Sequence, residues 1–138
     1  MRLRDRAAEA GRGEGVSIQA EQRVRNPAQL EDLIEDTKDR IADAVLIVDQ
    51  AEEEMRKARR AFDHEFARAI VSSDFSEVTL RRAEATMVAM PEKEEADRTE
   101  EAYHHAQREA NSLEKELFAW QSILNSVKAM WNAPGGRS

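Results

Sequence analysis

The chain has 138 residues, no cysteine and a formal net charge of −7; charged residues make up 36% of it and aromatic residues 5%. The lack of cysteine excludes disulfides and thiolate metal sites and is compatible with a reducing cytoplasm. The dominance of Ala, Glu, Lys, Leu and Arg is typical of long helices or coiled coils, and few large apolar residues remain to build a separate globular core. We therefore expect other copies of the chain or other partners to supply the missing burial.

The composition predicts three regions. Three glycines between positions 11 and 15 disfavour a helix, and six arginines against four acids give the first 25 residues a net charge of +2. We predict a flexible Arg-rich arm over 1–25, a helical domain over 26–132 and a flexible tail over 133–138. No apolar segment follows the basic start, and no run approaches the ~18–20 residues that span a bilayer, so we expect neither a secretory signal nor a membrane contact.

The first helix is predicted to begin at Asn26-Pro27, with Asn26 as the N-cap and Pro27 in the first helical position. From Leu30 onward, mostly apolar residues recur at alternating spacings of four and three, which is the heptad pattern of a coiled coil. The seam, meaning the a and d positions of this heptad, comprises Leu30, Ile34, Thr37, Ile41, Ala44, Val48, Ala51, Met55, Ala58, Phe62, Glu65 and Ala69. The pattern predicts about five heptads packed on another helix.

Within this helix, the segment IADAVLIV at 41–48 is apolar on nearly all sides. A contact with a single other helix would leave Leu46 or Ile47 exposed to water. We therefore expect a second contact surface here, toward another helix or another copy, and a homo-oligomer.

The stretch Val71-Ser72-Ser73-Asp74 interrupts the pattern, because Ser and Asp favour turns and helix caps. A second, shorter helix is predicted to begin between Ser73 and Ser76. Pro91 is expected to end or kink it. One face of this helix carries Leu80, Ala83, Met87 and Met90.

The third helix is predicted to start near Glu92 and to end at Asn132, before Ala-Pro-Gly-Gly. Its seam comprises Ala96, Thr99, Tyr103, Ala106, Ala110, Leu113, Leu117, Trp120, Leu124, Val127 and Trp131. The largest side chains gather toward its C-terminal end, so we expect the tightest packing and the subunit interface there. The sequence thus predicts an all-α fold in which two long heptad-patterned helices form an antiparallel hairpin with a shorter connecting helix, in an oligomeric helical bundle.

Patterns for catalysis and metal binding are sparse. Glu101 and His104 have the Glu-x-x-His spacing of carboxylate-bridged di-iron bundles, but such sites need a second motif, and His64 has no glutamate three residues before it. No serine lies in a strand-turn-helix elbow, and the Gly-Arg-Gly-Glu-Gly at 11–15 follows no predicted strand. We expect no enzymatic activity, no metal site and no cofactor.

The most unusual feature is a concentration of cations in an acidic chain. The basic run, meaning Arg56, Lys57, Arg59 and Arg60, puts four positive charges within five positions. In one interpretation the run is a solvated helix face, because Glu52–Arg56 and Glu53–Lys57 have the spacing of stabilising helix pairs. In the other it contacts the phosphates of a polyanion, since the local field outweighs net charge within a Debye length of ~8–10 Å.

The residues around the basic run resemble the UvsY-type phage recombination mediators, over roughly residues 50 to 131. The family's Lys-Ala-Arg motif followed by an aromatic residue is matched by Lys57-Ala58-Arg59-Arg60-Ala61-Phe62. Asp74-Phe75-Ser76 opens a short helix, and the segment SLEKELFAWQSILNSVKAM is similar to the family's closing segment. The chain differs from the family in having Phe62 in place of the usual tyrosine and a longer, more acidic stretch between Met90 and Ser112.

The resemblance implies a small helical protein of the cytoplasm (of the host cell, if a phage encodes it) that assembles into rings. Such proteins bind single-stranded DNA and help a RecA-like recombinase displace single-strand-binding protein. By carry-over from the motif, Lys57 and Arg59 would contact phosphates, and we infer that Arg56 and Arg60 assist by proximity. The acidic stretch 92–101 would engage a basic surface on a protein partner.

We therefore expect a non-enzymatic recombination mediator that binds single-stranded DNA and helps load a RecA-like recombinase onto it. The alternative is a helical structural or interaction protein, such as a phage assembly chaperone or adaptor, without nucleic-acid binding. A helical-hairpin secretion substrate is less consistent with the sequence, because no Trp-x-Gly turn lies between the long helices.

Overall fold

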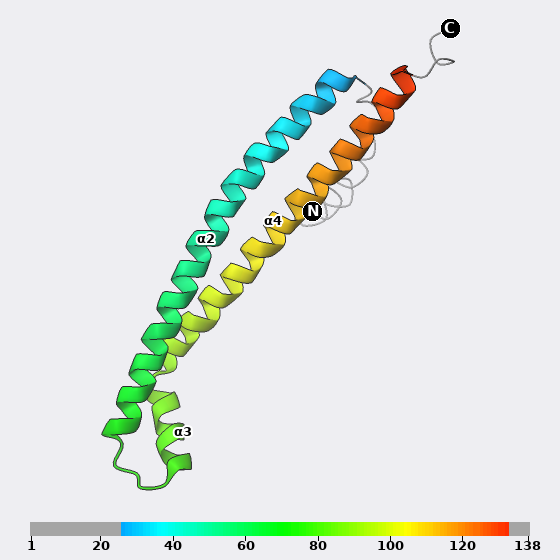
Figure 1. Cartoon of the computed structure of the whole chain (residues 1–138). Coiled ribbons are helices and arrows are strands. Elements are labelled where there is room, and N and C mark those ends of the chain that lie inside the picture. Colours follow the sequence, from blue (N-terminus) through cyan, green and yellow to red (C-terminus); the bar gives the residue numbers. More distant parts are fainter. Residues whose placement is uncertain (1–25, 133–138) are drawn as a thin grey trace, which may run out of the picture. The chain divides into compact units, whose positions relative to one another are not determined.

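The computed structural model describes residues 26–132, and these residues are almost entirely helical. Three helices follow in chain order, α2 (Pro27–Ser72), α3 (Val78–Val88) and α4 (Met90–Asn132), and the described residues contain no strand (Figure 1). The prediction of an all-α fold with two long helices and a shorter one between them is confirmed. The predicted arm at 1–25 and tail at 133–138 lie outside the described residues.

The start of α2 agrees with the sequence. The Asn26 side-chain oxygen accepts a hydrogen bond from the backbone N–H of Ala28 at 2.9 Å, and the Asn26 carbonyl accepts one from Leu30 at 3.2 Å. Pro27, which has no N–H to leave unsatisfied, fills the first helical position. The polar cap and the proline together fix where this helix begins.

The heptad pattern predicts the buried faces of both long helices. All twelve seam residues of α2 are buried or half-buried, and so are ten of the eleven in α4, with Trp131 the exception at 55% exposed. Two polar seam residues, Thr37 and Thr99, are nevertheless buried. Each donates its hydroxyl to the carbonyl four residues earlier in its own helix, at 2.7 Å and 2.9 Å, so neither requires a partner across the seam.

The described residues divide into two compact units, and the first combines 26–40 with 113–132. It contains a core of Leu30, Ile34 and Leu124, against which Leu33, Leu117, Trp120, Ile123 and Val127 pack. Ion pairs join Arg40 to Glu116 at 3.5 Å and Lys128 to Glu31 at 3.3 Å. Because the α4 partner number rises as the α2 number falls, the two helices are antiparallel here. Most of the large side chains predicted to pack at this end of α4 do so, but Phe118 and Trp131 are 72% and 55% exposed.

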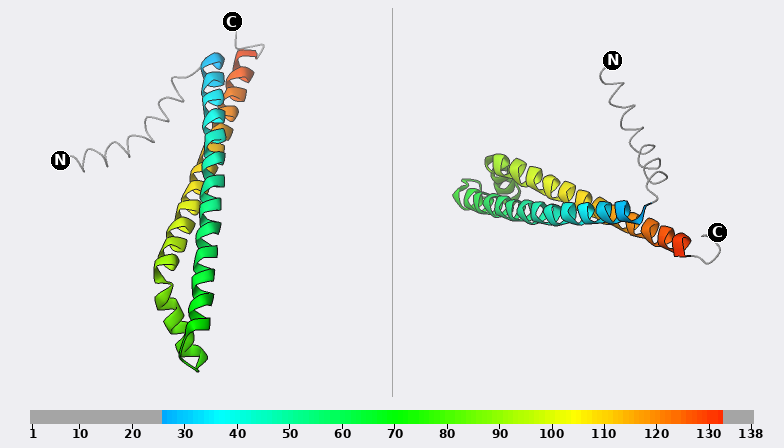
Figure 2. Two further views of the ribbon diagram at one scale, coloured as in Figure 1. Left: turned by 90° about the vertical axis from the view of Figure 1, so that its left-hand side faces the viewer. Right: turned by 90° about the horizontal axis from the view of Figure 1, so that it is seen from above.

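The second unit is Ile41–Ser112, where α2 and α4 also lie side by side, as the additional views show (Figure 2). Small side chains dominate its buried residues, which are Ala44, Met55, Ala58, Ala85, Ala89, Ala96, Thr99 and Ala106. An ion pair joins Arg59 to Glu100. Alanines along a seam permit close helix approach but bury little apolar surface, so this unit has a thin core.

The connection after α2 is held by polar contacts. The Ser73 hydroxyl donates to Glu84 at 2.6 Å and accepts from the backbone N–H of Phe75 at 3.2 Å, while the Arg81 guanidinium donates to the Phe75 carbonyl. α3 starts at Val78, so the prediction of a start between Ser73 and Ser76 was wrong by a few residues. The reason is that Ser73 orders the turn itself rather than capping the helix.

The break between α3 and α4 lies at Ala89, a turn residue two positions before Pro91. This agrees with the predicted end or kink, because proline has no N–H and disfavours a helical conformation in the residue before it. Leu80, Ala83 and Met87 are exposed on α3, whereas Met90, which the pattern placed on the same helix, begins α4 after the break and is also exposed. The side chains that α3 and its turn bury are Ala85 and Ala89.

Several large apolar side chains of the described residues are exposed. Val45, Leu46 and Ile47 are 47%, 68% and 59% exposed, as the all-round apolar pattern at 41–48 predicts. Phe118 is 72% exposed on α4. Among the described helices, none combines the length and the hydropathy needed to cross a bilayer.

Candidate nucleic-acid interface

The basic run lies on α2, where its residues flank the seam residues Met55, Ala58 and Phe62. Met55 and Ala58 are buried, so the helical repeat directs the four cations of the run away from the core. All four side chains of the run are exposed. They do not form one patch, however, because positions 56 to 60 cover more than a full turn of helix.

Arg56 has a partner on its own helix. Its guanidinium forms an ion pair with Glu52, one turn earlier, and the Arg56 side chain remains 65% exposed. The sequence predicts this pair and also one between Glu53 and Lys57, which is not formed. An exposed pair of this spacing contributes about 0.3–0.5 kcal/mol, which a stronger anion can displace.

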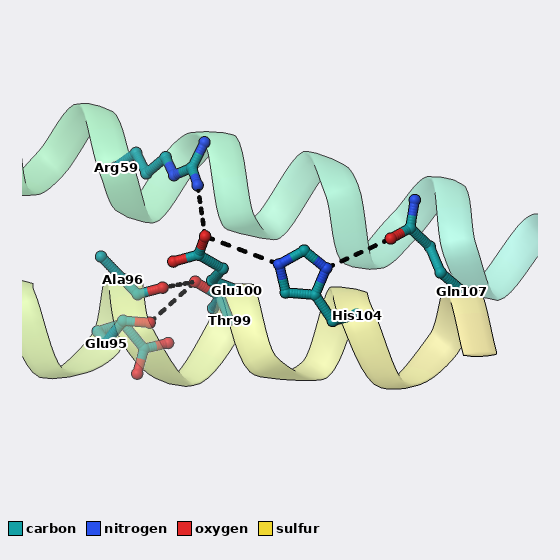
Figure 3. A network of polar contacts seen from close by, with 7 residues as sticks. All are labelled: Arg59, Glu95, Ala96, Thr99, Glu100, His104 and Gln107. Carbon is teal, nitrogen blue, oxygen red and sulfur yellow. Dashed lines mark hydrogen bonds and ion pairs between the residues drawn. The ribbon is translucent and has the colours of Figure 1, made fainter. Parts of the chain in front are cut away.

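Arg59 reaches across the seam to α4. Its guanidinium donates to the Glu100 carboxylate at 2.8 Å (Figure 3). The same carboxylate oxygen lies 3.7 Å from Nε2 of His104, whose Nδ1 faces the Gln107 side-chain oxygen at 3.4 Å. Arg59 is therefore engaged in holding the two helices together, unlike the other members of the basic run.

Lys57 borders a shallow groove between α2 and α4, of about 370 Å³. The groove is lined by Glu54, Lys57, Ala58, Ala61, Glu95, Arg98 and Thr99. The described residues 26–132 offer the Lys57 ammonium no hydrogen bond or ion pair. The small side chains of Ala58 and Ala61 in its lining leave room for an incoming group beside Lys57.

Two of the groove's charged residues neutralise each other. Arg98 donates to both carboxylate oxygens of Glu95, one turn earlier on α4. This hydrogen bonding lowers the pKa of the Glu95 carboxyl below its usual 4.5, and the Glu95 bond raises the pKa of Arg98. Because the folded-state pKa of Glu95 is depressed, its contribution to stability is present above about pH 4.5 and is lost as the pH falls through the lowered value. The pair is exposed, so that contribution is small.

Arg60 is exposed and, within residues 26–132, makes no hydrogen bond or ion pair. It borders a second open groove with Arg56 and the acids Asp49, Glu52 and Glu53. Lys57 and Arg60 are thus the two cations of the run whose charge the described residues leave without a direct partner.

Phe62, which follows the motif, is half-buried on the seam. Its ring packs against Phe66 with centroids 5.7 Å apart. Phe66 lies one turn later in the same helix and is also half-buried, so the two rings cover each other and Phe62 is not displayed as an open platform for stacking a base.

Residues 26–132 contain no group of three or more His, Cys, Asp or Glu side chains arranged to hold a metal ion. Glu101 and His104, which have the Glu-x-x-His spacing, form no ion pair with each other; His104 lies within 3.7 Å of the Glu100 carboxylate instead.

Sequence reasoning missed Glu100 as the partner of Arg59. A signal for it exists, because Arg59 and Glu100 each directly follow a seam residue, Ala58 and Thr99. Residues that flank the seam of paired helices commonly form ion pairs across it. The position of Glu100 depends on the register of the two helices, which the repeat alone leaves open.

No family model, no curated protein and no solved structure matches this chain.

Proposed function

We propose that this chain is a non-enzymatic mediator of recombination that binds single-stranded DNA through the outward side of α2. The support comes from the resemblance around Lys57-Ala58-Arg59 and from the exposure of the whole basic run. The protein would act in the cytoplasm, on DNA covered by single-strand-binding protein, and would help load a RecA-like recombinase. It would do so as a homo-oligomer, because repeating a weak contact around an assembly multiplies its strength.

The observation that carries this proposal is that the charges of Lys57 and Arg60 have no partner among the described residues. Both are exposed on a long, regular helix, and the described residues give neither one a hydrogen bond or an ion pair. Arg56 pairs with Glu52 of its own helix, but this exposed pair is weak. A DNA phosphate can therefore replace Glu52 as the partner of Arg56. Three cations are therefore available to phosphates, whereas Arg59 has a defined structural partner.

The proposed mechanism contains no covalent chemistry. The cations of α2 replace counterions held by the DNA phosphates, so binding is steeply salt-dependent and largely independent of base sequence. Among residues 26–132, no Phe, Tyr or Trp beside the run is exposed, so stacking adds little and the affinity of each copy is low. By holding the DNA strand and the recombinase together, the protein favours the recombinase over single-strand-binding protein in their competition for DNA, by mass action.

The test is a titration of fluorescein-labelled oligo-dT followed by anisotropy, over a series of salt concentrations. We expect Lys57→Ala/Arg60→Ala to bind roughly tenfold more weakly at low salt and to lower the slope of log K against log salt by about 1.4, because two phosphate contacts are lost. Arg82→Ala/Lys115→Ala removes the same charge from two exposed residues outside the run and should bind like the wild type.

Two results would contradict the proposal. One is that the wild-type chain fails to bind oligo-dT at low salt. The other is that the control variant loses as much affinity as the variant in the basic run, which would mean that net charge alone governs binding.

A second candidate function is supported by the exposed apolar side chains. Leu46, Ile47 and Phe118 are each more than half exposed, which fits a structural or interaction protein such as an assembly chaperone or adaptor. This candidate predicts no binding of oligo-dT at any salt concentration, so the same titration separates the two functions.

A further inference from the structure

One stretch of α4 in the first unit carries no charge. Charged residues make up 36% of the chain, yet residues 117–127 contain none, and this is the longest such run in the sequence. The neutral face of α4 means the exposed residues of this stretch, namely Phe118, Ala119, Gln121, Ser122, Asn125 and Ser126. Phe118 is the only large apolar side chain among them and is 72% exposed, so the described residues leave its ring in water.

The outward side of α2 in the same unit differs from this face. Its exposed residues between 31 and 40 are all charged, namely Glu31, Asp32, Glu35, Asp36, Lys38, Asp39 and Arg40. A segment that covers the neutral face removes apolar surface from water, whereas a segment that covers α2 must remove water from charges. An apolar segment that can reach both helices therefore favours α4.

The chain outside the described residues joins this unit at one end. Asn26 caps the start of α2, and α4 ends at Asn132. The ion pair between Glu31 and Lys128 shows that these two ends lie together (Figure 1). Residues 1–25 therefore join the unit beside the end of α4. Residues 133–138 start there too, but they contain no large apolar side chain.

The sequence before Asn26 contains a segment that matches the neutral face. Residues 15–20 are also free of charge, and within them Val16, Ile18 and Ala20 alternate with polar residues. This alternation puts the three apolar side chains on one side of an extended chain. The segment thus offers an apolar side to an apolar ring without placing a charge against it.

The lengths agree with a contact between Ile18 and Phe118. Phe118 lies fourteen residues before Asn132, which is about 21 Å along a helix. Ile18 lies eight residues before Asn26, and an extended chain of that length spans up to about 26–29 Å. Ile18 therefore reaches Phe118 when the residues between Ile18 and Asn26 are largely extended, which is the conformation that the alternation favours.

Charge at the end of α4 favours the same path. The last turn of α4 contains no basic residue, although the carbonyl end of a helix attracts cations. Arg23 and Arg25 lie within three residues of Asn26. A segment that runs from Asn26 onto α4 brings both guanidinium groups to that end of the helix.

We propose that residues 16–25 of the chain run along the neutral face of α4 of the same copy, in an extended conformation. Ile18 then covers the Phe118 ring, Ala20 lies beside Ser122, and Arg23 and Arg25 lie at the carbonyl end of α4. Part of the segment whose composition predicts a flexible arm is thereby held in place.

This contact assigns the neutral face to the chain's own N-terminal segment, although the repeat alone predicts a subunit interface at this end of α4. The contacts of a homo-oligomer then fall to other exposed apolar side chains, such as Leu46 and Ile47 of the second unit.

A pair of introduced thiols tests the contact in the full chain, which has no cysteine of its own. Ala20→Cys/Ser122→Cys should form an intramolecular disulfide. The control, Ala20→Cys/Asp36→Cys, puts the second thiol on the exposed side of α2, ten residues from Asn26, just as Ser122 lies ten residues from Asn132. Measured against a glutathione redox buffer, the effective concentration of the two thiols should be at least about tenfold higher in the first variant.

Further changes in the Ala20→Cys/Ser122→Cys variant test which side of the segment faces α4. Ile18→Asp should lower the effective concentration at least about fivefold, because it puts a charge against the Phe118 ring. Gln19→Asp adds the same charge on the side that faces away and should leave the value within about twofold. Phe118→Ala should lower it as Ile18→Asp does, with the helical circular dichroism unchanged, because the ring is outside the core.

Equal effective concentrations for the Ser122 and Asp36 pairs would overturn the proposal, and so would equal effects of Ile18→Asp and Gln19→Asp. Mass spectrometry of the unreduced product separates disulfides within one chain from disulfides between two chains. If the latter predominate at low protein concentration, the segment covers a second copy, and the proposed contact within one copy is wrong.

Discussion

At the scale of single residues, burial in the first unit depends on very few large side chains. Leu30 is fully buried, although it lies only one turn from the start of α2. It contacts a core completed by Ile34 and Leu124. The N-cap at Asn26 therefore does more than start the helix. It also fixes the position of Leu30, the first residue of this core.

We expect Leu30→Ala to lower the free energy of unfolding by about 2–3 kcal/mol, from lost apolar transfer and the cavity left behind. Urea unfolding followed by circular dichroism measures this. Met87→Ala removes a side chain of similar size that is 75% exposed, and it should change stability by less than about 0.5 kcal/mol. Similar losses in the two variants would show that the Leu30 core does not contribute as described.

At the scale of secondary-structure elements, one exposed ion pair joins the two long helices in the second unit. Glu100 accepts from Arg59 across the seam and also lies beside His104 of its own helix (Figure 3). The side chains of Arg59 and Glu100 are 51% and 41% exposed, so solvent screens the attraction. The pair is better suited to fix the register of α2 against α4 than to supply much stability.

A double-mutant cycle with Arg59→Ala and Glu100→Ala tests this pair. We expect a coupling free energy of about 0.2–1 kcal/mol at low salt, decreasing as salt is added. The measurement is urea unfolding of the two single variants, the double variant and the wild type. A coupling free energy of zero at low salt would mean that the contact does not hold the helices in register.

Much of these elements is predictable from the heptad repeat. The repeat identified both seams, Asn26 identified the start of α2, and Pro91 identified the break before α4. The outward face of α3 and the Arg59–Glu100 pair were not predictable. Both depend on which residues of another helix lie opposite, and a repeat that recurs every seven residues is compatible with more than one register.

The sequence predicted that the residues of the candidate site lie at the surface, but it did not predict all of their ion-pair partners. The repeat directs Arg56, Lys57, Arg59 and Arg60 to the surface, and their exposure agrees. Counting four residues back predicted the Glu52–Arg56 pair correctly and the Glu53–Lys57 pair wrongly. Side-chain pairing on an exposed helix differs by only a few tenths of a kcal/mol between alternatives, so spacing alone does not select one.

At the scale of the whole molecule, the two units have cores of different composition. The first buries leucine and isoleucine, whereas six of the eight buried residues in the second are alanine. A buried Leu or Ile contributes roughly 1.5–3 kcal/mol relative to exposure, and an alanine contributes much less. Local stability should therefore differ between the units.

Hydrogen exchange of the backbone amides, followed by mass spectrometry, tests this difference. We expect slower exchange in peptides covering 30–37 and 117–127 than in those covering 55–62 and 92–99, because opening the first unit exposes more apolar surface. Leu30→Ala should accelerate exchange mainly in the first pair of peptides. Faster exchange in the first unit of the wild type would mean that fraying of the helix ends outweighs its larger core.

The position of the polar turn after α2 bears on whether the fold tolerates a cut in the backbone. Each unit is assembled from one stretch before Ser73 and one stretch after it, and no glycine occurs anywhere in residues 26–132. A protease that nicked the backbone near Asp74 would produce two fragments, yet every pairing of α2 with α4 would join one fragment to the other. The halves could then be made as separate polypeptides and would be expected to reassemble by complementation, with the seams and the ion pairs between α2 and α4 together specifying the match.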